Sequence, residues 1–277
     1  MGLIVLSFTL LLLSNFTVAH PFSQWDALLD RRGVGPTDPF DFGWISSYAA
    51  LGDSYATGLG AGHVIKASQN ADLHKDCDQY SYGFPNILNS NDALGFNSNR
   101  RAQVLSCSSG TLSSILSDQV LKIQKSQLVT PSAGINNANF VNRAKDLINA
   151  PIFTDDLKAL LAGINDKLVD DQSRVFWVGY ERFWNPDTDA CNDVSWAYSS
   201  ALRSRKYLTK DKRKQMNDIT DALNDKIKTI CGTNSRCVFV DTNGRVDHLK
   251  GRFCEDGVKE NDSFAANPTD GANREET

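Results

Sequence analysis

Short apolar runs alternate with helical patterns along most of the chain, and this alternation restricts the fold more than any other feature. Strand-like runs rich in β-branched or aromatic residues, each followed by small or polar residues, occupy positions 47–51, 103–105, 127–130, 174–178 and 237–240. Between them, apolar residues recur at helical spacing within 112–123, 157–168 and 215–230. Strands that alternate with helices form a parallel sheet covered on both faces. The sequence therefore predicts a three-layer α/β/α sandwich with a mainly parallel sheet.

Three of the expected strands end in loops that should meet at one edge of the sheet. The first loop begins with Asp53 and Ser54, the second covers residues 107–110, and the third covers residues 134–137. In parallel α/β sheets, ligands bind outside the carboxyl ends of the strands. We therefore expect these loops to line one crevice.

Ser54, Gly110 and Asn136 are the loop residues that fit a hydrolytic site. A serine that attacks an ester needs a base and hydrogen-bond donors for the oxyanion. The backbone N–H of Ser54 itself and that of Gly110 can donate, and glycine lets bare backbone approach a ligand closely. The Asn136 amide donates without bringing a charge. The alternative is an ordinary serine in a strand-to-helix loop, which is a common arrangement.

Three stretches, residues 51–62, 106–111 and 132–140, resemble in this order the first three sequence blocks of the SGNH (GDSL) hydrolases. Residues 178–192 and 251–255 are also similar to the secreted fungal-type esterase and lipase branch of that family. The resemblance covers most of residues 47 to 260. It implies a flavodoxin-like SGNH hydrolase fold and hydrolysis of carboxylic esters. It also implies that Ser54 is the nucleophile and that Gly110 and Asn136 bind the oxyanion.

The chain departs from the family pattern in its third block. Ile135 stands where the family has a glycine, and we expect it to tighten the loop beside Asn136. Asn137 stands where the family has an aspartate, which removes a carboxylate that could fix the loop by hydrogen bonds.

The catalytic base is a second departure, because the family's Asp-x-x-His pattern does not occur in the chain. His248, in the loop after the last expected strand, is the candidate nearest to the family's position, although the adjacent Asp247 is poorly placed to orient it. His63, after the glycine-rich turn, is a weaker candidate. A solvated loop histidine is the alternative for both. His20 lies at the expected cleavage point and His74 in a polar insert.

Two other functions therefore stay open beside a secreted esterase or lipase. Without a base, the same scaffold would be a non-catalytic binding protein or a truncated product. A carbohydrate acetylesterase is the other alternative. Aromatic residues near the fourth expected strand could line an acyl or sugar pocket, but core packing is the more common use of such residues. They are Phe176, Trp177, Tyr180, Phe183 and Trp184.

The first residues predict export. An apolar stretch over residues 3–13, followed by small residues up to Ala19, is typical of a signal peptide over residues 1–19, with a membrane anchor as the alternative. We expect an N-terminal extension over 20–43, in which Arg31 and Arg32 are a possible processing site. The hydrolase-like domain should cover 44–260, and a polar tail with a glycan acceptor at Asn261 should cover 261–277.

Six cysteines fit an oxidising compartment. Cys231 and Cys237 are close enough to close one hairpin or loop, and the other four cysteines would form two longer bridges, although six cysteines allow fifteen pairings. No spacing typical of a zinc site occurs, and we expect neither a metal nor a cofactor. A net charge of −4 without a basic block makes nucleic acid an unsuitable partner. We expect a monomer that acts on a small-molecule, lipid or carbohydrate ester.

Overall fold

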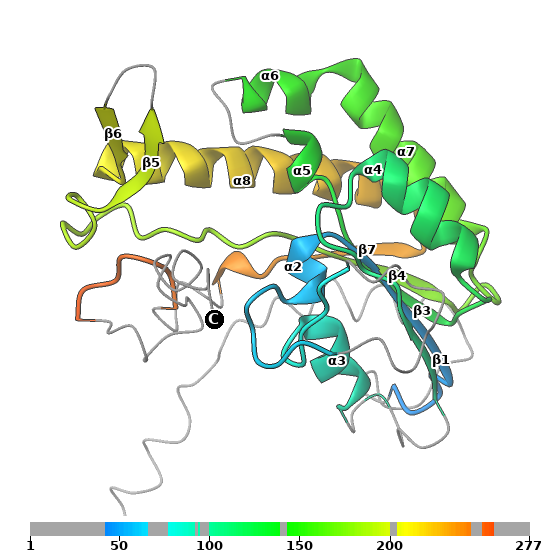
Figure 1. Cartoon of the computed structure of the whole chain (residues 1–277). Coiled ribbons are helices and arrows are strands. Elements are labelled where there is room, and N and C mark those ends of the chain that lie inside the picture. The colour runs from blue at the N-terminus through cyan, green and yellow to red at the C-terminus, as the bar shows by residue number, and fades with distance from the viewer. Residues whose placement is uncertain are drawn as a thin grey trace, which may run out of the picture.

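A five-stranded parallel sheet forms the centre of the part of the chain that the computed structural model describes (Figure 1). That part comprises residues 42–65, 77–91, 94, 100–138, 143–199, 204–244 and 251–257. The strands lie in the order β2-β1-β3-β4-β7, and all neighbours are parallel. They are β1 (Ser47–Gly52), β2 (Arg101–Val104), β3 (Leu128–Ser132), β4 (Arg174–Val178) and β7 (Cys237–Val240).

Helices cover both faces of this sheet (Figure 1). One face carries α4 (Leu112–Ser114), α7 (Pro151–Asn165) and α8 (Lys210–Gly232), with α5 (Ile135–Ala138) and α6 (Ala144–Asn149) beside α8. The opposite face carries α3 (Phe84–Asn89), and the short α2 (Ser54–Thr57) follows the end of β1. The expected three-layer α/β/α architecture is confirmed.

The two cores follow from the alternation of side chains along each strand. Ala49 and Leu51 of β1 face the larger core, which α4, α7 and α8 complete. Tyr48 and Ala50 face a smaller core on the other side, against which Leu88 of α3 packs. Because β1 is buried on both faces, the turn at its end starts from a rigid support.

The five expected strands are present with ends shifted by at most two residues. The expected helix over 112–123 is instead three short pieces: α4, a π-helix η4 (Ile115–Gln119) and a 3-10 helix η5 (Val120–Lys122). The alternation also did not predict a separate antiparallel pair, β5 (Ser195–Ser199) and β6 (Ser204–Tyr207). The predicted signal peptide, the Arg31–Arg32 pair and the polar tail lie outside the described residues.

Three disulfides join the six cysteines. Cys231–Cys237 connects the end of α8 to the start of β7, as the short spacing predicted. The other two bridges, Cys77–Cys107 and Cys191–Cys254, span 30 and 63 residues of sequence. In the described part of the chain, no helix is both long enough and apolar enough to span a membrane.

Candidate active site

Ser54 lies at the carboxyl end of β1, as the first residue of α2. Asp53 caps this helix, and its Oδ1 atom accepts a hydrogen bond from the Tyr55 N–H at 3.0 Å. Gly52 has a φ of +143°, and a Cβ atom there would lie 2.3 Å from the carbonyl oxygen of Ser132. Only glycine fits this turn, because the side chain of any other residue would collide with β3. The turn leaves Ser54 partly exposed.

Gly110, in the loop after β2, lies directly beside this turn. A Cβ atom at Gly110 would be 3.1 Å from the carbonyl oxygens of both Gly52 and Cys107. The Gly110 N–H donates a hydrogen bond to Cys107 O at 3.1 Å, which closes a tight turn in which Ser109 has a φ of +66°. A long bond of this type can be shared with a second acceptor. An oxyanion would have to share or replace the bond to Cys107.

Asn136, on α5 after β3, connects the third loop to the second. Its Nδ2 atom donates a hydrogen bond to Gly110 O at 2.9 Å. A side-chain amide carries two hydrogens, so one remains for a ligand. The neighbouring Asn137 accepts a hydrogen bond from the Leu112 N–H at 2.8 Å. The family's aspartate could fix this loop by hydrogen bonds. The amide oxygen of Asn137 makes a hydrogen bond of that kind.

Gln119 supports the turn from below, and the sequence analysis did not single it out. Its side chain accepts from the Gly52 N–H at 2.8 Å and donates to Gly52 O at 2.9 Å. Gln119 is the last residue of the π-helix η4 and is buried. The sequence signal for Gln119 was that a polar residue occurs within the otherwise apolar helix face expected for residues 112–123.

Tyr180 is the second residue that the sequence analysis did not place in the site. Its hydroxyl donates to Asp53 Oδ2 at 2.6 Å and accepts from the Ile135 N–H at 3.3 Å. Tyr180 and Trp177 are completely buried in the larger core, in agreement with the core-packing alternative for these aromatics. The hydroxyl nevertheless connects the turn of Ser54 to the loop of Asn136. Sequence carried no signal for this contact because its partner lies 127 residues earlier.

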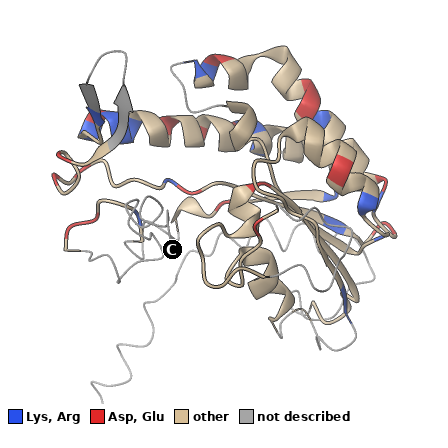
Figure 2. Cartoon of the chain, viewed as in Figure 1, with Lys and Arg blue, Asp and Glu red and all other residues tan. Residues whose placement is uncertain are grey.

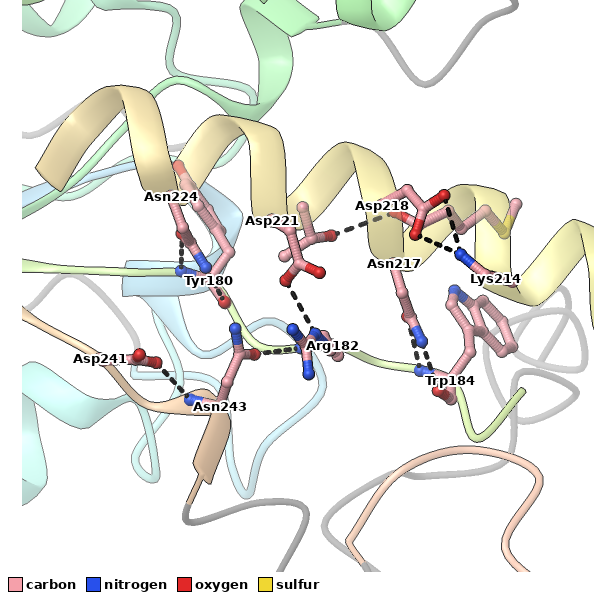
Figure 3. Close-up of polar contacts among 12 residues, drawn as sticks. Tyr180, Arg182, Trp184, Lys214, Asn217, Asp218, Asp221, Asn224, Asp241 and Asn243 are labelled. Carbon is pink, nitrogen blue, oxygen red and sulfur yellow. Dashed lines mark hydrogen bonds and ion pairs between the residues drawn. The ribbon is translucent and has the colours of Figure 1, made fainter. Parts of the chain in front are cut away.

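The segment after β4 runs along α8, and contacts with this helix hold Tyr180 in place (Figure 3). Asn224 of α8 accepts from the Tyr180 N–H at 2.9 Å and donates to Tyr180 O at 2.7 Å. Seven residues earlier on the helix, Asn217 bonds to the N–H and C=O of Trp184 in the same way. Between them, Arg182 forms an ion pair with Asp221 at 2.8 Å. On the side that faces α8, the two asparagine side chains thus form the hydrogen bonds that a neighbouring strand would form with this extended segment.

The electrostatics of the turn are dominated by a buried carboxyl group. Burial raises the pKa of Asp53 to about 6, although the hydrogen bonds from Tyr180 and from the Tyr55 N–H act in the opposite direction. Burial and the nearby Asp53 raise the pKa of Tyr180 well above its ordinary value, so its hydroxyl keeps its proton. Burial also raises the pKa of Glu181, whose carboxylate bonds to the Tyr55 hydroxyl. The pKa of a carboxyl group rises in this way because burial disfavours its charged form.

Two segments of the described chain near Ser54 carry no formal charge. Residues 54–65 and 79–90 contain no Asp, Glu, Lys or Arg, and Figure 2 shows the ribbons of α2 and α3 themselves in tan. Large apolar side chains are exposed there; they are Leu59, Val64, Ile65, Tyr82 and Ile87. Backbone hydrogen bonds join the two segments, for example from the Tyr82 N–H to Ala61 O at 3.0 Å.

The structure brings Ser54, Gly110 and Asn136 to one edge of the sheet, but it does not add a base to them. His63 is exposed, and its backbone pairs with Ser81. Among the described residues, none forms a hydrogen bond with the Ser54 hydroxyl. His248 and Asp247, like His20 and His74, lie outside the described residues. The same part of the chain contains no cluster of His, Cys, Asp and Glu that could hold a metal ion.

No protein-family model matches the chain, and no curated protein matches it by sequence. Solved structures do match the chain in their fold. An extracellular lipase from Streptomyces rimosus has a TM-score of 0.58 and 19% identity over 76% of this chain and 84% of its own. A phospholipase A1 from Streptomyces albidoflavus has a TM-score of 0.57 and 22% identity over 79% of this chain and 91% of its own. The fold is that of the SGNH hydrolases. At these identities, the likeness to SGNH hydrolases is one of fold.

Proposed function

We propose that this protein is a secreted SGNH-type hydrolase of carboxylic esters, with Ser54 as the nucleophile. The supporting observation is the contact chain at the sheet edge. Gly110 packs against the backbone of Gly52, two residues before Ser54, and the Asn136 amide donates to Gly110 O at 2.9 Å. These contacts between three loops that are far apart in sequence support a site in which the partly exposed Ser54 hydroxyl works with two donors.

In the proposed reaction, the Ser54 Oγ atom attacks the acyl carbon while a base takes its proton. The negative charge that develops on the carbonyl oxygen is stabilised by the N–H groups of Ser54 and Gly110 and by the second amide hydrogen of Asn136. Collapse of this intermediate releases the alcohol, which takes the proton from the base. Water then cleaves the acyl-enzyme by the same steps. His248 is the base we propose, because it follows β7 in the sequence and the loops after strands of such sheets line the ligand site.

The uncharged segments 54–65 and 79–90 near Ser54 favour an ester with an apolar acyl group. Leu59, Val64 and Tyr82 expose apolar atoms there and offer no charge that a polar or ionic substrate would need. The two solved structures with the same fold are named as a lipase and a phospholipase A1. Export is supported by the pairing of all six cysteines, since disulfides persist in oxidising compartments.

The nucleophile is tested with a fluorophosphonate probe followed by peptide mapping of the adduct. We expect one adduct, on Ser54, in the wild-type protein and none in Ser54→Ala. Asn136→Ala should lower the hydrolysis of a short-chain p-nitrophenyl ester by about a hundredfold or more in a variant that remains folded. Asn165→Ala, at the end of α7, is the matched control and should keep the wild-type rate.

Two outcomes would contradict the proposal. A folded wild-type protein that forms no adduct would support the binding-protein alternative instead. A normal rate in Asn136→Ala would remove that residue from the oxyanion site. The base is tested separately: His248→Ala should abolish turnover, and His63→Ala should not, so the reverse result would exchange their roles.

A further inference from the structure

The Tyr180 hydroxyl forms one hydrogen bond to each of two loops that the proposed reaction must hold together. It donates to Asp53 Oδ2 at 2.6 Å and accepts from the Ile135 N–H at 3.3 Å. Asp53 directly precedes Ser54, and Ile135 directly precedes Asn136. We infer that Tyr180 is a positioning residue that sets the distance between the nucleophile and the oxyanion donor. This inference rests on the proposed function.

A direct backbone contact between the first and third loops lies where the two loops leave the sheet. The Asp53 N–H bonds to Ser132 O at 3.3 Å, which joins β1 to β3 before the chains diverge. Beyond that point, Gly134 has a φ of +126° and turns the third loop toward α5. The hydroxyl of Tyr180 lies between the diverging loops and uses its donor for one and its acceptor for the other.

Tyr180 is held firmly enough to act as such a support. Asn224 bonds to both of its backbone groups, at 2.9 and 2.7 Å (Figure 3). Its ring packs against that of Tyr55, with a distance of 5.4 Å between ring centroids. Because the side chain is completely buried, water does not compete for either hydrogen bond of the hydroxyl. A small displacement of the loops would therefore have to break a bond inside the core.

Tyr48 shows what a purely structural tyrosine looks like in the same fold. It is also completely buried, and its hydroxyl shares one hydrogen bond of 2.8 Å with Thr130. Tyr48 lies in β1 and Thr130 in the neighbouring β3, and both are away from the loops of Ser54 and Asn136. Tyr48→Phe and Tyr180→Phe therefore remove the same atom from equally buried rings, and only the second removal touches the site.

The experiment compares these two variants in three measurements. Tyr180→Phe should lower kcat for a short-chain ester, and the rate of fluorophosphonate labelling of Ser54, by about 10- to 100-fold, because a small misplacement of reacting groups is this costly. KM should stay unchanged, since ester binding does not use the hydroxyl. Tyr48→Phe should keep wild-type kinetics. Amide hydrogen exchange at Ile135 should become faster in Tyr180→Phe and not in Tyr48→Phe.

A double variant distinguishes positioning from a general loss of stability. In an Asn136→Ala background, Tyr180→Phe should cost less in kcat than in the wild-type background, because the donor that it positions is already absent. Equal kinetics of Tyr180→Phe and wild type, or an equal loss in both tyrosine variants, would overturn the inference. If the wild-type protein itself is not labelled, the proposed function fails. Hydrogen exchange at Ile135 then still decides whether Tyr180 fixes this loop.

Discussion

The side chain of Gln119 forms a pair of hydrogen bonds with the backbone of Gly52. The N–H and the carbonyl oxygen of Gly52 are both engaged, at 2.8 and 2.9 Å. Gly52 ends β1, two residues before Ser54, at a point where β2 has already ended. A side chain from a π-helix thus continues the hydrogen bonding of the sheet for one more residue, together with the Cys107 N–H, which also donates to Gly52 O at 3.0 Å. Local π-helical turns often occur at functional sites, and this one brings an amide to the base of the proposed nucleophile turn.

We expect Gln119→Met to lower the free energy of unfolding by about 2–3 kcal/mol, because it leaves the buried N–H of Gly52 without a partner. It should also reduce ester hydrolysis, since the turn of Ser54 loses its support. Gln103→Met is the matched control. Gln103 also bonds to two backbone groups, Lys122 O at 3.2 Å and the Gln124 N–H at 2.9 Å, but in an exposed position. Urea unfolding that gives both variants the same midpoint would contradict this role of Gln119.

The strands and the three loops were predictable because each depends on local sequence. Apart from Arg174, the run 174–178 is apolar and β-branched or aromatic, which fits a strand buried on both faces. Parallel strands share one carboxyl edge, so the loops of Ser54, Gly110 and Asn136 had to lie at the same edge once the fold class was correct.

The supports of the site were not predictable in the same way. Gln119 falls on the apolar face expected for residues 112–123, but periodicity shows neither the π-helical turn there nor the backbone groups that its side chain meets. Tyr180 contacts Asp53 over 127 residues of sequence, and such a pairing depends on the packing of side chains. The contact of Asn137 was likewise not visible in the sequence. Its amide oxygen accepts the Leu112 N–H, so an uncharged side chain fixes the loop after all.

The Cys77–Cys107 disulfide should matter for both stability and activity. It encloses 30 residues of sequence and ends in the loop that carries Gly110. In the loop-entropy model, replacing both cysteines by serine should cost about 3–4 kcal/mol. Hydrolysis should fall as well, because the turn from Cys107 to Gly110 loses its anchor.

The Cys231–Cys237 disulfide provides the control for this prediction. It spans only 6 residues, so its removal should cost about 2 kcal/mol in the same model. It joins α8 to the start of β7, at the amino end of the strand and away from the proposed site. Both double variants should therefore lose thermal stability, but only the removal of Cys77–Cys107 should lower ester hydrolysis. A loss of activity from removing Cys231–Cys237 alone would show that stability, and not the Gly110 loop, controls the rate.

The buried Asp53 predicts an unusual dependence of stability on pH. Its pKa is about 6 in the folded protein, against an ordinary value of 3.8. Below about pH 4 the Asp53 carboxyl group is protonated in both the folded and the unfolded state, so folding buries no charge. As the pH rises through 6, the unfolded chain has already released this proton, so the folded protein must bury a charge. The contribution of Asp53 to the free energy of unfolding should therefore fall by about 3 kcal/mol between about pH 4 and pH 7.

Comparison with Asp53→Asn isolates this effect from that of the other carboxylates. The amide can still accept the Tyr55 N–H but cannot ionise, so the stability of wild type relative to the variant should decrease as the pH rises. Asp189 is a control of opposite sign, because a hydrogen bond from Lys210 lowers its pKa and its contribution is lost as the pH falls. Urea unfolding at several pH values measures both differences. A constant difference between wild type and Asp53→Asn from about pH 4 to pH 7 would mean that Asp53 keeps an ordinary pKa, because only a shifted pKa links its ionisation to folding.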